Sequence, residues 1–277
     1  MLTPVMLQSQ ARSGTTVFML ILSCAKDIYF SHEYPFEERD LNYMVRLVNL
    51  ATRPIERKLR NELLKPNMDA LRGYPYVGAG DFFDNSDAAK RNLFLTLWRG
   101  YSTNARKNGS YRYYAEKVVA DVAEQVDTFI GTKSIFLMRD PRAVFNSILQ
   151  FDEKRGYYAF GRQEGEPVTE YAARFCSWQK APMQQFAALE PGDSRLKLRY
   201  EDLMQGLAAA VGNIEAFLDT TIDRSKLKRD FGAFIGRHAT SDSASSSVSG
   251  WREKLPADVA SLITERMGEE LALLDYA

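Results

Sequence analysis

The sequence has few of the residues that mark disulfide-rich, metal-binding or nucleic-acid-binding proteins. Its two cysteines, Cys24 and Cys176, lack CxxC spacing, which predicts buried free thiols in a reducing compartment. Basic and acidic residues number 36 each, and this zero net charge argues against nucleic acid as a partner. None of the usual metal-ligand spacings occurs, so no metal is expected.

The sequence also lacks a hydrophobic run long enough to cross a membrane. The apolar stretch of residues 17–25 is far shorter than the roughly 20 residues that a spanning helix needs, and no basic segment precedes it as in a signal peptide. We therefore expect a cytoplasmic protein without a membrane span. Apolar residues make up 45% of the 277 residues, which suits one large globular domain.

Short apolar runs alternate with longer helical patterns along the chain. Buried strands are predicted over residues 4–8, 133–139 and 195–200. Helices are predicted from residue 14 onward and from 141 onward, and over residues 88–105, 168–189, 201–218 and 256–274. This alternation predicts an α/β fold in which helices cover both faces of a central, mainly parallel sheet.

Two segments depart from this alternation. Residues from about 31 to 110 contain charged, helical pieces, and we expect them to form a helical insertion on the substrate side. Residues 238–250 are small, polar and rich in serine, which predicts a mobile lid that a ligand orders. Neither segment interrupts the predicted sheet, so a single domain over residues 1–277 is expected.

The loop after the first predicted strand is suited to an anion. Gly14 permits a tight turn, and the amides at the start of the next helix point at the anion together with the hydroxyls of Thr15 and Thr16. A GxxxxGK[ST] loop would have lysine where Thr15 stands, which disfavours a nucleoside triphosphate. Arg12 supplies the cation instead, so Arg12 and Ser13 through Thr16 are expected to hold one phosphate or a short phosphoanhydride. The alternative is that RSGTT only caps the helix.

A second anion-binding position is expected where another predicted strand ends. Arg139 stands at the carboxyl end of that strand, and Ser147 lies two turns into the following helix. Ligands of parallel α/β sheets gather at such strand ends, and the guanidinium fork suits a phosphate. Two separate positions indicate a nucleotide with phosphates on both sides of its ribose. The alternative is that Arg139 forms a surface ion pair with Asp140 or with a helix carboxylate.

These motifs together resemble those of the PAPS-dependent sulfotransferases of bacterial type, with some similarity to the tyrosylprotein enzymes. QARSGTT resembles their 5′-phosphosulfate-binding loop, and RDPRAVFNS resembles their 3′-phosphate-binding motif. LRYEDL and the segment from WREKLPADV to LALLDY are similar to later family segments, although Asp275 replaces a glycine. The segments occur in family order, whereas residues 40–110 and 152–190 match nothing in the family.

The resemblance implies a P-loop-containing three-layer sandwich that transfers a sulfuryl group from 3′-phosphoadenosine 5′-phosphosulfate (PAPS) to a hydroxyl or amine. The other product is adenosine 3′,5′-bisphosphate (PAP). Positioning and charge stabilisation dominate such a loose, in-line transfer, and Arg12 would stabilise the leaving phosphate. By the same resemblance Tyr200 contacts the adenine, with a merely buried strand-end tyrosine as the equal alternative, and Trp251 and Arg252 belong to the lid over the adenine and the 3′-phosphate.

An acceptor hydroxyl also needs a base, and the chain has only two histidines, His32 and His238. Some family branches carry a catalytic glutamate at about the distance of Glu33 from the loop, which implies Glu33 as the base and His32 as the second candidate. The family's glutamate–lysine pair implies that Lys117 neutralises the transferred group, although Val118-Val119 replaces the usual Thr-Pro. The alternatives are a polar pair on a surface loop and an ion pair at a helix start.

Two other functions fit the same motifs. One is a small-molecule P-loop kinase, against which Thr15 in the lysine position speaks. The other is a catalytically inactive nucleotide-binding protein of the same fold, which the altered segment after Lys117 favours. The acceptor stays open among small molecules, glycans, lipids and peptides, and so does the oligomeric state.

Overall fold

The sheet of this protein is parallel and has its first strand at the centre. A computed structural model describes residues 1–32, 35–52, 86–238 and 243–276. Within these ranges β1 (Thr3–Ser9) lies between β3 (Tyr113–Val118) and β4 (Lys133–Met138). β2 (Ile28–Tyr29) and β5 (Arg195–Arg199) form the two edges, which gives the order β2-β3-β1-β4-β5. The three predicted strands are confirmed as β1, β4 and β5, whereas β2 and β3 were not predicted.

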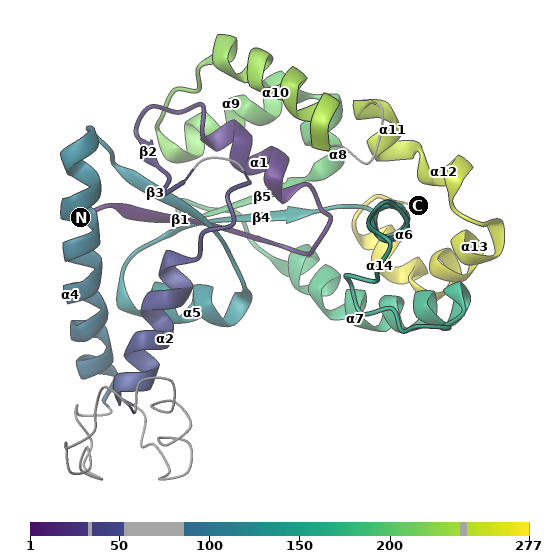
Figure 1. Ribbon diagram of the computed structural model, residues 1–277, viewed down its shortest axis with the longest axis horizontal. Helices are drawn as coiled ribbons and strands as arrows, with labels where there is room; N and C mark the ends of the chain where they lie inside the picture. The colour runs from purple at the N-terminus through teal and green to yellow at the C-terminus, as the bar shows by residue number, and fades with distance from the viewer. Residues whose placement is uncertain (33–34, 53–85, 239–242, 277) are drawn as a thin grey trace.

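Helices cover both faces of the sheet (Figure 1). One face carries α1 (Thr15–Leu22), α8 (Tyr200–Gln205), α9 (Leu207–Leu218) and α10 (Arg224–His238). The other carries α2 (Asp40–Thr52), α4 (Asp87–Ala105) with the short 3-10 helix η2 (Arg106–Asn108), and α5 (Ala120–Phe129). Each layer buries its own apolar cluster against the sheet. The predicted α/β fold is therefore confirmed.

A third group of helices lies beyond the carboxyl ends of the strands, on the right in Figure 1. It consists of α6 (Pro141–Arg155), α7 (Val168–Ala188), α11 (Ala244–Ser249), α12 (Trp251–Lys254), α13 (Ala257–Arg266) and α14 (Gly268–Leu273). Its core includes Phe145, Tyr171 and Phe175, whose rings contact one another. Helices therefore surround the carboxyl end of the sheet, which is where ligands of parallel α/β sheets gather.

Three helical segments differ from the prediction. Gly206 divides residues 201–218 into α8 and α9, and the final segment is divided into α13 and α14. Part of the Ser-rich segment forms α11 instead of a loop, because Ser243 and Ser246 make a reciprocal capping box at its start. The remainder of the predicted helical insertion and of the predicted lid, residues 53–85 and 239–242, lies outside the described residues.

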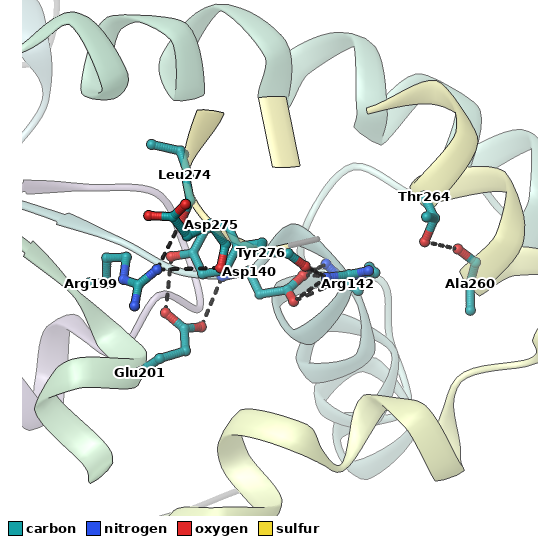
Figure 2. Close-up of polar contacts among 9 residues, drawn as sticks. All are labelled: Asp140, Arg142, Arg199, Glu201, Ala260, Thr264, Leu274, Asp275 and Tyr276. Carbon is teal, nitrogen blue, oxygen red and sulfur yellow. Dashed lines mark hydrogen bonds and ion pairs between the residues drawn. The ribbon is translucent and has the colours of Figure 1, made fainter. Parts of the chain in front are cut away.

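A buried polar network attaches the end of the chain to the sheet (Figure 2). The hydroxyl of Tyr276 donates to Glu201 at 2.9 Å, and the other Glu201 oxygen accepts from the backbone N–H of Asp140 at 3.0 Å. Arg142 forms an ion pair with Asp140 at 2.9 Å and donates to the carbonyl oxygen of Tyr276. The network therefore fixes the start of α6 at the carboxyl end of β4.

Candidate functional site

The loop of residues 10–14 leaves the central strand and begins α1. Gly14 has a φ of 88°, a left-handed conformation that glycine adopts at little cost. A Cβ at Gly14 would stand 2.3 Å from the ring of Tyr200, so only glycine fits beneath that ring. Gly14 also offers no side chain to cap α1, and the first-turn N–H groups of the helix therefore face the loop without a side-chain acceptor. This is the backbone geometry of an anion site.

Arg12 connects this loop to α6. Its Nε donates to the hydroxyl of Ser147 at 3.2 Å. Its guanidinium lies 4.8 Å from the ring centroid of Phe151, one turn further along the same helix. The first predicted anion position and the serine of the second are therefore in direct contact.

Arg139 completes the same cluster from the end of β4. Its Nη1 donates to the carbonyl oxygen of Arg12 at 2.7 Å, and its guanidinium lies 4.4 Å from the ring centroid of Tyr200. Its Nη2 donates to the carbonyl oxygen of Ser247 on α11. Arg139 is buried, and the carboxylate of Asp140 pairs with a different arginine, so the alternative of a surface pair between Arg139 and Asp140 is wrong.

The electrostatics of this cluster favour a bound anion. Burial first, and then the nearby positive charge of Arg139, lower the pKa of Arg12. Three buried donor atoms of this cluster have no hydrogen-bond partner within the described ranges: Gln10 Nε2, Ser13 Oγ and Arg139 Nε. Buried donors normally have an acceptor, and two guanidinium groups side by side need negative charge. The residues therefore fit phosphate groups of the kind that PAPS carries.

A cleft of about 420 Å³ opens beside the start of α1. Thr15 and Thr16 line it from α1, and Lys117 lines it from the end of β3. The Lys117 ammonium donates to Thr16 Oγ1 at 3.1 Å and to Glu37 Oε1 at 2.6 Å. Lys117 is thus a strand residue inside the cleft and not a helix-start residue, although it does form an ion pair, with the exposed Glu37.

A comparison with protein families identifies the family of this chain. The model described as "Sulfotransferase family" matches residues 4–224. The chain belongs to the sulfotransferase family. Among solved structures, it is similar to the sulfotransferase domain from the curacin biosynthetic pathway, with 17% identity, a TM-score of 0.56 and coverage of 100% of this chain and 99% of that chain.

A mouse structure has the same fold. It is the sulfotransferase SULT7A1 complexed with PAP, with 12% identity, a TM-score of 0.51 and coverage of 99% of this chain and 89% of that chain. The search of curated proteins found no match. At these identities the two solved structures show the fold alone, whereas the family model supports sulfuryl transfer as the general activity.

The predicted base of this sulfotransferase, Glu33, lies outside the described residues. His32 is exposed and forms an ion pair with Glu38 at 3.2 Å, and Glu38 lines the cleft. On the other side of Glu33, the carbonyl oxygen of Pro35 accepts a hydrogen bond from Lys117 at 3.2 Å. The described neighbours of Glu33 on both sides are therefore connected to residues of the cleft.

The two predicted lid residues of the sulfotransferase pack together beside Arg142 at the start of α6. Trp251 is buried under Arg142, whose guanidinium lies 4.3 Å from the ring centroid. Arg252 packs on the outer side of the same ring at 4.7 Å. α11 reaches the cluster through the Ser247 carbonyl and through a 3.0 Å hydrogen bond from the Tyr200 hydroxyl to Ser247 Oγ.

Sequence reasoning missed several residues in or beside the site, among them Gln10, Glu37, Glu116 and Phe151. Glu116 is buried and accepts from the N–H of Leu41 at 2.7 Å and from the Tyr114 hydroxyl at 2.8 Å. Burial raises the pKa of Glu116 to about 7 against the effect of these hydrogen bonds. Of these residues, Phe151 could most easily have been predicted from the sequence, because it follows Ser147 by one helical turn and so shares its face of the helix.

The described part of the chain has neither a metal-binding group of side chains nor a helix suited to a membrane. No group of three or more His, Cys, Asp or Glu residues there could hold a metal ion. No helix there is both long enough and apolar enough to span a bilayer.

Proposed function

We propose that this sulfotransferase transfers a sulfuryl group from PAPS to a hydroxyl or amine of an acceptor. The observation that carries the proposal is the contact of the two arginine positions through Arg12, Arg139 and Ser147, next to the uncapped start of α1. An adenosine with a phosphate on each side of its ribose matches such a paired site. The mouse sulfotransferase complexed with PAP supports the same donor.

The two ends of the site take different roles in this proposal. The first-turn amides of α1, with Arg12, Ser13 and the hydroxyls of Thr15 and Thr16, bind the 5′ end and stabilise the charge that develops on the leaving phosphate. Arg139 and Ser147 bind the 3′-phosphate. Tyr200 already places its ring against Arg139 and Gly14, from where it contacts the adenine, and α11 with Trp251 and Arg252 closes over this end.

The residues of the cleft serve the transfer itself. When bound, PAPS supplies the sulfuryl group. Lys117, held 3.1 Å from Thr16 at the start of α1, neutralises charge on the transferred group or on the oxygen that it leaves. Glu33 accepts the proton of the acceptor hydroxyl, and His32 is the second candidate. The contacts of their neighbours Pro35 and Glu38 with the cleft support this placement.

The test is donor consumption in the presence of an acceptor panel of phenols, alcohols, sugars, lipids and tyrosine peptides. We expect conversion of PAPS to PAP together with a sulfated product, and loss of this conversion in Arg12→Ala. Arg266→Ala, which removes an exposed arginine of α13, is the matched control and should keep the wild-type rate.

The other outcomes of this test point to the rival functions. Tight PAP binding without turnover across the panel would favour the inactive nucleotide-binding protein. Tight binding of Mg-ATP with phosphoryl transfer would favour the kinase.

A further inference from the structure

A second hollow, of about 750 Å³, lies next to the cleft at the far end of α6. Its lining from α6 and the following loop includes Leu149, Asp152, Glu153, Tyr157, Tyr158 and Glu164. Three of these side chains are carboxylates and two are aromatic rings. Carboxylates beside aromatic faces are the surroundings that an organic ammonium or guanidinium group prefers.

Asp152 places a buried carboxylate in the wall of this hollow. The residue is only 4% exposed, although an aspartate is rarely buried without a partner. One carboxylate oxygen accepts from the N–H of Ala159 at 3.0 Å. The other oxygen, Oδ2, has no hydrogen-bond partner in the described part of the protein. A donor from a ligand in the hollow would supply the missing interaction.

The aromatic rings of the hollow are available to a cation. Tyr157 and Tyr158 are 57% and 43% exposed, which is high for such large rings. The protein itself already places a cation on one of them, because the Arg162 guanidinium lies 4.9 Å from the ring centroid of Tyr158. Arg162 also donates to the carbonyl oxygen of Glu166 at 2.9 Å, and this hydrogen bond holds its guanidinium beside Glu166. The ring of Tyr157 and the carboxylates of Glu153 and Glu164 remain for a ligand.

The hollow and the cleft share a wall. Phe160 lines the cleft and packs edge-on against Phe151 at 5.4 Å between ring centroids. Phe151 lies under Arg12, and its helical neighbour Asp152 lines the hollow. These two rings therefore connect the two places, and an acceptor that extends past them would reach both.

We propose that this hollow binds a positively charged ammonium or guanidinium group of the acceptor, while the acceptor's nucleophile lies in the cleft. The identification of this ligand as the acceptor rests on the proposed sulfuryl transfer. The binding of a cation in the hollow does not depend on that transfer. Asp152 and the two exposed carboxylates select the charge, and Tyr157 with Tyr158 contacts the adjoining apolar part.

The first experiment measures binding to the full chain without donor, by calorimetric titration with phenethylammonium and with its neutral analogue 2-phenylethanol. We expect the ammonium to bind about tenfold more tightly, as a cation between carboxylates and an aromatic face does. Asp152→Asn and the double variant Glu153→Gln/Glu164→Gln should abolish this preference, and the double variant keeps the test valid if Asp152→Asn does not fold. Glu190→Gln, at an exposed position, is the matched control. Equal affinities for both probes would overturn the proposal.

The second experiment separates the acceptor role from the binding site. With PAPS present, kcat/KM is compared for tyramine and for 4-ethylphenol, which lacks the ammonium. We expect a ratio of about ten in favour of tyramine that falls to about one in Glu153→Gln/Glu164→Gln, with the 4-ethylphenol value unchanged. A ratio that the variant leaves unchanged would overturn the acceptor assignment. If neither phenol reacts, sulfuryl transfer to phenols fails, and the titration by itself upholds or overturns the cation site.

Discussion

At the scale of single residues, the centre of the site is a stack of Gly14, Tyr200 and Arg139. The Tyr200 ring lies so close to the Gly14 Cα that no side chain fits between them, and the Arg139 guanidinium covers the same ring at 4.4 Å. The hydroxyl of Tyr200 donates to Ser247, so the stack extends to α11. The conformation of one glycine therefore determines where both the loop of residues 10–14 and the lid helix lie.

Gly14→Ala tests this stack. The added Cβ would meet the Tyr200 ring at 2.3 Å, and alanine at a φ of 88° is strained. We expect a loss of about 1–3 kcal/mol in the free energy of unfolding, together with weaker PAP binding. Gly131→Ala is the matched control, because a Cβ at Gly131 meets no atom within 4 Å, and its effect should stay within about 0.5 kcal/mol. Chemical denaturation gives both values, and equal stability of the two variants would contradict the stack.

The base is the second question at the residue scale. Replacing Glu33 by Gln removes a proton acceptor but no positive charge of the donor site. We expect Glu33→Gln to lower kcat on the order of 100-fold and to leave the Kd for PAP nearly unchanged. Glu37→Gln is the comparison in the same segment, because Glu37 pairs with Lys117 and should affect kcat by less than about tenfold. A wild-type rate in Glu33→Gln, or a larger loss in Glu37→Gln, would move the base assignment away from Glu33.

At the scale of elements, the sequence was most informative where a strand or helix has one uniform character. β1, β4 and β5 are short apolar or alternating runs, α4 and α7 begin and end close to their predicted bounds, and α6 begins at its predicted residue. β3 was missed because polar Glu116 and Lys117 occupy positions of a buried strand for reasons that only tertiary contacts reveal. β2 spans two residues, which is too short for any periodicity.

The candidate site likewise contains residues that the sequence could predict and residues that it could not. Arg12, Arg139 and Ser147 were predictable because each stands at a fixed place relative to a strand end. The distance between the two arginine positions was not predictable, since it depends on β1 and β4 being neighbours in the sheet. Glu37 and Gln10 lie in irregular segments whose course the local sequence does not determine.

α2 begins against a buried acid of the neighbouring strand. The carboxylate of Glu116 accepts from the N–H of Leu41 at 2.7 Å and of Asn42 at 3.4 Å, which satisfies first-turn donors of the helix. Burial, the largest influence, nevertheless raises the pKa of Glu116 from its ordinary 4.5 to about 7. Folding therefore holds a proton on Glu116 at pH values where the unfolded chain has lost it.

This pKa makes stability depend on pH in a definite direction. Below pH 4.5 Glu116 is protonated in both the folded and the unfolded state, and its contribution to the free energy of unfolding is at its maximum. As the pH rises to about 7 only the unfolded state ionises, so the free energy of unfolding should fall by about 3 kcal/mol from this group and then level off. Denaturation at pH 5 and pH 8 should show this fall in the wild type and in Glu124→Gln, an exposed control. The same fall in Glu116→Gln would contradict the assignment.

At the scale of the whole molecule, the end of the chain holds the end of β4, and with it Arg139, in place. Tyr276 donates to Glu201, and Glu201 accepts from the N–H of Asp140 immediately after Arg139 (Figure 2). Burial raises the pKa of Glu201 and of Tyr276, so neither group tolerates the loss of its partner easily. A change at the last turn of the chain is therefore transmitted to the end of β4.

Tyr276→Phe tests this connection by removing one hydroxyl from the buried network. We expect a loss of about 1–3 kcal/mol in the free energy of unfolding, because Glu201 stays buried with one donor fewer. Tyr43→Phe removes a hydroxyl from a side chain that is 65% exposed and should leave stability unchanged. Thermal and chemical denaturation of both variants check the difference, and a neutral Tyr276→Phe would mean that the chain end is only loosely attached.

The paired anion site is tested most directly by titrating PAP and adenosine 5′-phosphate into the wild type, Arg139→Ala and Ser147→Ala. The two nucleotides differ only in the 3′-phosphate that Arg139 and Ser147 are proposed to bind. We expect wild-type protein to bind PAP on the order of 100-fold more tightly, as charge-assisted contacts to a phosphate allow, and the two variants to lose most of that preference while keeping their affinity for adenosine 5′-phosphate. An equal loss of affinity for both nucleotides would contradict a site that binds one phosphate at each end of the ribose.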